Sequence, residues 1–230
     1  MTDPAMLEKR IGYTFSDKAL LNNALTHSSY ASENKLGYTA NNERLEFIGD
    51  AYVDAVVGMK LFEILGDSHE GVLSRYRADV VCEASLSEAA QSINLGEFLF
   101  LGRGEDTSGG RDKPSILADA FEALLGAILI DGGYDACKEV ILRLLGDKTL
   151  QAATGALSRD FKTKLQEIVQ EKSCNSVITY KVTDETGPDH NKTFTVSVSI
   201  NGAQCGTGTG SSKARAEQAA AKDALSKGVK

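Results

Sequence analysis

Apolar residues in the first two thirds of the chain recur every three or four positions, the spacing that places them on one face of a helix. Alternation of apolar and polar residues, which is typical of strands, is scarce in this part. The pattern predicts helices at residues 17–25, 41–65, 71–92, 115–130 and 134–145. It therefore favours an all-helical N-terminal domain over residues 1–150.

The pattern changes after a stretch of small and polar residues at 151–158, which we interpret as a linker. Beyond it, two segments are rich in β-branched and aromatic residues, and the second alternates apolar with polar residues, as a half-buried strand does. Asn201-Gly202 then predicts a tight hairpin turn. The expected order is a helix, three strands and a helix, at residues 160–171, 177–182, 193–200, 203–207 and 212–227. Residues 159–230 are thus expected to form an α+β domain of the order α-β-β-β-α.

The composition is that of a soluble globular protein, with 42% hydrophobic and 25% charged residues, and it excludes a disordered chain. The formal net charge of −7 argues at first against a nucleic-acid partner. The charge is unevenly distributed, however. Residues 1–150 carry 14 basic and 24 acidic side chains, whereas residues 151–230 carry 11 basic and 8 acidic ones. This asymmetry indicates two domains with different tasks.

The four cysteines are widely spaced and none belongs to a Cys-x-x-Cys pair, so neither a zinc ribbon nor a disulfide framework is expected. We predict buried free thiols, as in a reducing cytosol, at Cys82, Cys137, Cys174 and Cys205. The N-terminus lacks the apolar core of a signal peptide, and no run of about 18 apolar residues spans a membrane. These features predict a cytoplasmic protein.

The most apolar predicted helix carries a row of acidic residues. At about 100° per residue, one narrow stripe of this helix contains Glu43, Glu46, Asp50 and Asp54. Like charges at this spacing repel one another, so a helix that packs into the core gains nothing from them unless a cation is bound there. Any single acid can simply belong to a solvated helix face, and for Asp54 that interpretation and the functional one both stay open.

A second acidic pair lies in another almost wholly apolar helix. Asp119 and Glu122 are separated by three positions and so share a face. If the two helices pack together, their carboxylates meet. Oxygen ligands without His or Cys favour Mg²⁺ or Mn²⁺, and two such ions about 4 Å apart can activate water and stabilise a leaving phosphodiester oxygen. The spacing therefore indicates metal-dependent phosphoryl transfer, without identifying the substrate.

These motifs allow a family to be named. Residues 42–50 (NERLEFIGD) resemble the signature of the ribonuclease III family of double-stranded RNA endonucleases. Further matching stretches are residues 24–30 and 115–127. The C-terminal part resembles a double-stranded RNA-binding domain, through residues 162–167, 187–190 and 210–220. The resemblance covers nearly the whole chain and implies two domains, an all-α ribonuclease III-type endonuclease domain followed by an α+β RNA-binding domain.

The resemblance also implies roles for particular residues. The family is a homodimer with Mg²⁺ as cofactor and Mn²⁺ as a substitute, and the implied metal ligands are Glu46, Asp50, Asp119 and Glu122. Glu122 is the ligand expected to be indispensable, and Asp50 is expected also to orient the attacking water. Glu43 would lie near the cleft and the dimer surface. Phe47 resembles a dimer contact, although plain core packing is an equal alternative for it.

The implied reaction is hydrolysis of double-stranded RNA into products with 5′-phosphate and 3′-hydroxyl ends and short 3′ overhangs, in processing of ribosomal and messenger RNA. No side-chain nucleophile is required, so His27 is interpreted as a structural residue.

The C-terminal domain would then hold the duplex. One face of its first helix carries Thr163, Gln166, Glu167 and Gln170, which suit 2′-hydroxyls of the minor groove. His190 resembles a second minor-groove contact. Ser212, Lys213 and Arg215 begin the last helix, where its N-terminus favours phosphates, although these cations could instead be solvated surface charges. Position 214 departs from the family, which usually has a basic residue there; Ala214 predicts weaker and less salt-dependent binding.

Two other functions compete with an active endoribonuclease. One is a catalytically silent protein that acts by binding double-stranded RNA. The other is a helical phosphohydrolase acting on nucleotides, which would leave the C-terminal domain unexplained. The presence of all four implied ligands favours the enzyme.

Overall fold

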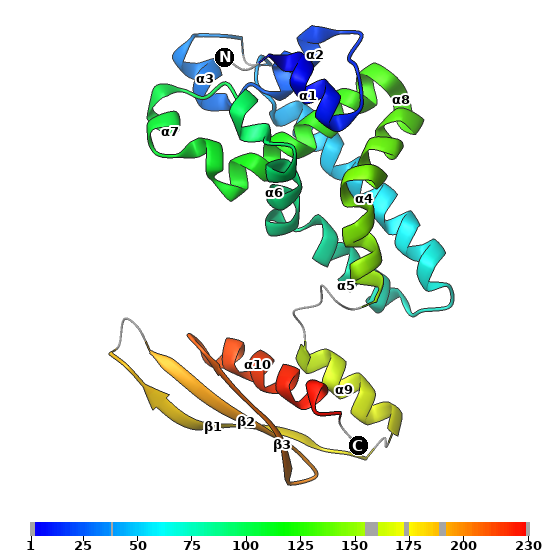
Figure 1. Ribbon diagram of the computed structural model, residues 1–230, viewed down its shortest axis with the longest axis vertical. Helices are drawn as coiled ribbons and strands as arrows, with labels where there is room; N and C mark the ends of the chain where they lie inside the picture. The colour runs from blue at the N-terminus through cyan, green and yellow to red at the C-terminus, as the bar shows by residue number, and fades with distance from the viewer. Residues whose placement is uncertain (1–2, 38, 155–160, 173–174, 189–191, 229–230) are drawn as a thin grey trace. The chain divides into compact units, whose positions relative to one another are not determined.

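The computed structural model describes residues 3–37, 39–154, 161–172, 175–188 and 192–228. The chain divides into two compact units, Met1–Leu157 and Ser158–Lys230 (Figure 1). The first unit contains α1 (Pro4–Ile11), α2 (Lys18–Ala24), α3 (Ser28–Glu33), α4 (Glu43–Leu65), α5 (Glu70–Val81), α6 (Glu83–Ser92), α7 (Arg103–Thr107) and α8 (Pro114–Ala153), with the short 3₁₀ helices η1 (Leu95–Phe98) and η2 (Gly110–Asp112). The second unit contains α9 (Phe161–Lys172), β1 (Ile178–Thr186), β2 (Thr193–Ile200), β3 (Ala203–Gly210) and α10 (Lys213–Ser226). An all-helical unit followed by an α-β-β-β-α unit confirms the predicted fold class.

The core of the first unit forms between α4 and α8. Val53, Val57 and Leu61 of α4 are fully buried, as are Phe121 and its apolar neighbours on α8. Burial of large side chains at this spacing supplies the main driving force for packing the two helices together. These two helices carry the acidic residues singled out from the sequence.

The predicted helices at 115–130 and 134–145 both lie within α8, where the non-helical backbone of Gly133 (φ 79°, ψ −177°) separates two helical segments, as predicted. This positive φ is open to glycine without strain. The helix also continues past Gly146, because Thr149 and Ala152 are buried in the core and the Thr149 hydroxyl donates to the Leu145 carbonyl. The first residues of the predicted linker, 151–153, belong to this helix. Positions 155–158 lie outside the described residues.

Two other sequence expectations were wrong. The single helix predicted at 71–92 is broken at Cys82, whose extended backbone (φ −72°, ψ 154°) separates α5 from α6. The apolar period is similar on both sides of this break, so the pattern did not indicate it. Cys82 is also exposed, whereas Cys137 is buried as expected and Cys205 is half-buried. Cys174 lies outside the described residues. The helices α1, α3 and α7 were not predicted.

In the second unit, α9 and α10 cover one face of an antiparallel sheet of order β1-β2-β3 (Figure 1). Leu165 and Val169 of α9 pack with Val196 and Val198 of β2 and with the alanines of α10. The turn at Asn201-Gly202 has positive φ at both positions, 50° and 83°, which confirms the predicted hairpin.

Glycines let α10 approach β3 closely. A Cβ on Gly208 would lie 2.1 Å from the Ala220 nitrogen, and Cβ atoms on Gly206 and Gly210 would collide with the same helix. The third strand was expected to end at 207 but extends to Gly210. The prediction ended early because glycines have low strand propensity. In this strand they are needed because the side that faces the helix has no space for side chains.

None of the helices in the described part of the chain combines the length and the apolar run that crossing a membrane requires.

Candidate active site

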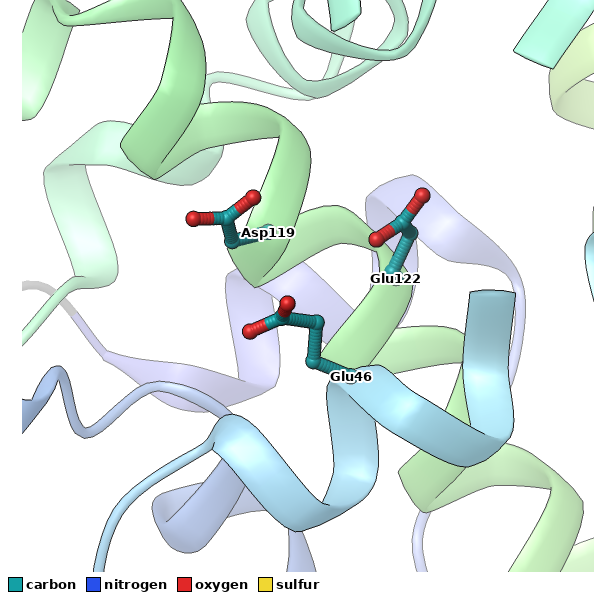
Figure 2. A group of neighbouring side chains, drawn as sticks. All are labelled: Glu46, Asp119 and Glu122. Atoms are coloured by element: carbon teal, nitrogen blue, oxygen red, sulfur yellow. The ribbon is translucent and has the colours of Figure 1, made fainter. Parts of the chain in front are cut away.

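Three carboxylates from two helices meet at one point of the first unit. Glu46 comes from α4, and Asp119 and Glu122 come from α8. One carboxylate oxygen of each lies within 4.8 Å of those of the other two, and all three residues are half-buried. Figure 2 shows the Glu46 side chain directed toward the segment of α8 that carries the other two. Helix packing thus joins two acidic motifs more than 70 positions apart.

The electrostatics of this cluster are unfavourable without a cation. Burial raises the pKa of Glu122 to about 8, and the negative charges of Asp50, Glu46, Asp119 and Asp54 add to the shift. The pKa of Glu46 is also raised, mainly by burial and then by Asp119. Because partial burial and mutual repulsion both oppose ionisation, a positive charge placed among these oxygens would be strongly favoured.

The donor set fits a hard divalent cation. In the described residues, the group contains carboxylate oxygens and neither His nor Cys. Mg²⁺ and Mn²⁺ prefer such ligands, and Mg²⁺ needs only one or two carboxylates because it keeps several waters. The three side chains are therefore suited to hold such an ion.

The other acids of the α4 stripe lie outside this group of three. Asp50, one turn after Glu46, is exposed, yet its charge contributes to the raised pKa of Glu122, so it lies close to the cluster. Asp54 pairs with Arg77 of α5, with Nε to Oδ2 at 3.8 Å. Glu43 is exposed and contributes to the raised pKa of Glu46.

One acid near the cluster was missed by sequence reasoning. Burial raises the pKa of Asp119, and the largest charge contribution to that shift comes from Glu83 at the start of α6. Glu83 is a lone acid at a helix N-terminus, the commonest structural position for one, so its sequence context contains no signal of a site. Only the packing of α6 beside α8 brings it near Asp119.

His27 has the structural role expected for it. Its Nδ1 accepts a hydrogen bond from the Ser29 backbone N–H at 3.2 Å and so caps α3. The Ser29 hydroxyl in turn accepts from the Gly102 N–H at 2.9 Å, which fastens the following loop to this helix. A positive charge on His27 would lower the pKa of Asp119, so the ring lies near enough to the cluster to interact with it.

Phe47 does not pack in the core. Its side chain is 77% exposed, the largest value among the exposed large apolar residues in the described part of the chain. It borders a groove that is also lined by Leu20, Ile48 and Ile130, and Ile130 is itself 57% exposed. This exposure contradicts the core-packing alternative and leaves an apolar surface at the start of α4.

Comparison with known proteins identifies both units. A family model described as Ribonuclease-III-like matches residues 17–149, and the double-stranded RNA binding motif matches residues 161–227. The chain belongs to the ribonuclease III family. Ribonuclease 3 of Caldanaerobacter subterraneus subsp. tengcongensis is 51% identical over 221 residues, covering 96% of each chain. Ribonuclease 3 of Desulforamulus reducens is 47% identical over 95% of this chain and 89% of its own length.

Solved structures agree with the assignment of the first unit as a ribonuclease III nuclease domain. The nuclease domain of ribonuclease III from Campylobacter jejuni has a TM-score of 0.59 at 44% identity, covering 64% of this chain and 97% of its own. A second structure of that nuclease domain, at the same TM-score and identity, is described as flexible in a region involved in dimer formation.

All eight residues predicted to contact RNA lie within the range that matches the double-stranded RNA binding motif. On α9, Gln166 and Gln170 are exposed and Thr163 and Glu167 are half-buried, on the side away from the buried Leu165 and Val169. His190 lies outside the described residues.

The start of α10 presents the predicted cations. Ser212 caps the helix through its hydroxyl, which accepts from the Arg215 N–H at 3.3 Å. Lys213 lies over the Phe194 ring, with Nζ 5.8 Å from the centroid, and the Arg215 Nη1 donates to the Ser211 hydroxyl at 3.0 Å. Ala214 is exposed between the two cations, so a basic side chain there would project into solvent.

Proposed function

We propose that this chain is an endoribonuclease that hydrolyses double-stranded RNA with a divalent metal ion, Mg²⁺ first and Mn²⁺ as a substitute. The observation that carries the proposal is the meeting of Glu46, Asp119 and Glu122 within 4.8 Å, in a chain that also contains a double-stranded RNA binding motif. The products would carry 5′-phosphate and 3′-hydroxyl ends with short 3′ overhangs. The family supports cytoplasmic action on ribosomal and messenger RNA.

In this mechanism the acids of α4 and α8 have separate tasks. Glu46, Asp119 and Glu122 hold the cation, and Glu122 is the central ligand because the charges of four other acids of α4 and α8 act on it. When bound, the cation supplies Lewis-acid stabilisation to the attacking and departing oxygens of the phosphodiester. Asp50 would complete the ligand set and orient the attacking water; its contribution to the raised pKa of Glu122 supports this role.

The second unit would hold the duplex, since an acidic nuclease domain repels RNA until its cations are bound. The polar side chains of α9 would contact 2′-hydroxyls across the minor groove, and Ser212, Lys213 and Arg215 would contact phosphates. The exposure of Gln166 and Gln170, and the helix N-terminus at Ser212, support these roles.

We also infer that the chain acts as a homodimer through the surface around Phe47. An exposed aromatic side chain beside a groove that is lined in part by Leu20, Ile48 and Ile130 suits a two-fold contact, in which the same patch of each copy meets the other. Sedimentation analysis of Phe47→Asp should show monomers, whereas Leu150→Asp, which changes an exposed leucine elsewhere, should stay dimeric. A Phe47→Asp protein that sediments as a dimer contradicts the inference.

The experiment that tests the enzymatic proposal compares wild type with Glu122→Gln on long duplex RNA in Mg²⁺, measuring cleavage and binding separately. Wild type should cut, and Glu122→Gln should bind the duplex but leave it intact. Binding without cleavage by wild type would instead support the catalytically silent alternative. Analysis of the product ends checks the 5′-phosphate and 3′-hydroxyl.

A further inference from the structure

The helices α4 and α8 come into backbone contact through two glycines. A Cβ on Gly49 would lie 1.9 Å from the carbonyl oxygen of Glu122, and a Cβ on Gly126 would lie 2.0 Å from the carbonyl oxygen of Leu45. Each helix thus presses a glycine against the backbone of the other. Both obstacles are main-chain atoms, which cannot rotate away as a side chain can.

This contact lies at the acidic cluster itself. Gly49 stands between Glu46 and Asp50 in the sequence, and the carbonyl that it touches belongs to Glu122. Gly126 is one turn beyond Glu122 and touches the residue before Glu46. These two close backbone contacts are therefore within one turn of the carboxylates on either side.

The separation of the helices determines whether these carboxylates can share one ion. Ordinary contact for a Cβ begins near 3.4 Å, so an alanine at Gly49 or Gly126 requires the backbones to separate by roughly 1.5 Å. Mg²⁺ binds oxygen at about 2.0–2.1 Å in near-ideal octahedral geometry, whereas Ca²⁺ accepts about 2.3–2.6 Å and a flexible geometry. A helix separation of this size is larger than the coordination of Mg²⁺ tolerates, and it weakens the binding of a larger ion less.

We propose that Gly49 and Gly126 are positioning residues that set the distance between the carboxylates of α4 and α8, and thereby the size of cation that the cluster holds. This inference rests on the metal site of the proposed function. Neither glycine touches the ion or the RNA; both act through the spacing of the helices that carry Glu46, Asp119 and Glu122.

The same two helices contain matched controls. Gly58 of α4 has only an ordinary contact for an added Cβ, 3.5 Å from Arg77 Cδ, and Gly146 of α8 has nothing within 4 Å. Alanine favours a helix more than glycine does, so Gly58→Ala and Gly146→Ala should leave the melting temperature unchanged or raise it.

The test measures Mn²⁺ binding to the full-length protein without RNA, through the electron paramagnetic resonance signal of free Mn²⁺, with Ca²⁺ as competitor. Wild type and both controls should bind alike. Gly49→Ala and Gly126→Ala should bind Mn²⁺ at least about tenfold more weakly, with Ca²⁺ competing relatively better. The double variant Gly126→Ala, Asp119→Glu has one longer ligand side chain, which can reach across the widened gap. It should recover Mn²⁺ affinity without recovering the melting temperature.

The outcomes separate the two proposals. If wild type binds no Mn²⁺, the metal site of the proposed function fails. If wild type binds Mn²⁺ and the folded Gly49→Ala and Gly126→Ala proteins bind it equally well, the positioning role is overturned. Should neither variant fold, Glu122→Asp and Asp119→Glu, each made in the wild-type background, change the length of one ligand side chain instead. If their Mn²⁺ affinities stay within about twofold of wild type, the positioning role is overturned.

Discussion

In the nuclease domain three half-buried carboxylates from two helices lie within 4.8 Å of one another, whereas the polar side chains of α9 and the start of α10 are spread over the surface of the second unit. The first arrangement concentrates charge, and each member raises the energy of the others until a cation binds. In the second, the side chains are exposed or half-buried, and the loss of one contact is small. The difference teaches that a single substitution in the cluster should abolish cleavage, whereas a single substitution on the second unit should weaken RNA binding only in part.

The largest expected effect tests this division directly. Glu46→Gln and Asp119→Asn should each lower the single-turnover cleavage rate on the order of 10²–10³-fold, the scale on which removing one transition-state contact acts, while the Kd for duplex RNA stays the same. Gln166→Ala is the counterpart in the second unit. It should raise the Kd severalfold and leave the rate at saturating RNA unchanged.

Rapid-quench cleavage and gel-shift titration on the same duplex separate the two quantities. If Glu46→Gln weakens binding as much as Gln166→Ala does, then the cluster also holds RNA and the division between the domains is wrong.

The next effect concerns packing, because glycine also controls a close backbone approach in the second unit. Gly208→Ala would place a Cβ 2.1 Å from the Ala220 nitrogen, so we expect it to destabilise this unit by about 1–3 kcal/mol and to weaken RNA binding throughout. Thr209→Ala, at an exposed position of the same strand, is the control. Hydrogen exchange of β2 and β3 measures the loss.

The helices of the nuclease domain should keep wild-type exchange in that experiment. Loss of protection in α4 and α8 as well would mean that the two units are not independently stable.

How far the site follows from the sequence can be judged from these same residues. The i, i+3 and i, i+4 spacings predicted which acids share a face, since helix geometry alone determines that. The meeting of Glu46 with Asp119 depends on tertiary packing, which one sequence does not contain. The sequence pattern gives no reason for glycines at positions 49 and 126; the backbone of the opposite helix is what requires them.

The same holds for the fold: features determined by local sequence could be predicted, and features determined by tertiary contacts could not. The paired positive φ values at Asn201 and Gly202 follow from residue type, so the hairpin was predictable. The break at Cys82 has no signal in the local pattern, and the helix beyond Gly146 is held by the burial of Thr149 and Ala152 in the core.

A smaller effect follows from the raised pKa of Glu122. In the metal-free folded protein this carboxyl holds its proton up to about pH 8, whereas the unfolded chain releases it near the ordinary value of 4.5. The folded state therefore binds more protons between these values, and its stability should fall as pH rises through them. Glu122→Gln should remove this part of the slope.

Melting temperatures in EDTA between about pH 5 and pH 8 check the sign. Mg²⁺ should stabilise wild type more at the upper end of this range, since binding must displace the proton. A wild-type slope that Glu122→Gln leaves unchanged would show that other groups cause it.

The smallest expected effect lies in the second unit, at the position that departs from the family. Ala214 is exposed between Lys213 and Arg215 at the N-terminus of α10, so Ala214→Lys adds a cation where phosphate contacts are expected, without disturbing the core. One additional phosphate contact should raise affinity severalfold at low salt and steepen the dependence of log K on log salt by about 0.7–0.9.

Ala214→Gln is the neutral control, and titration at several salt concentrations measures both quantities. Equal affinity and an unchanged salt slope for Ala214→Lys would mean that this turn does not face the duplex, and the RNA contacts would then have to be sought on α9.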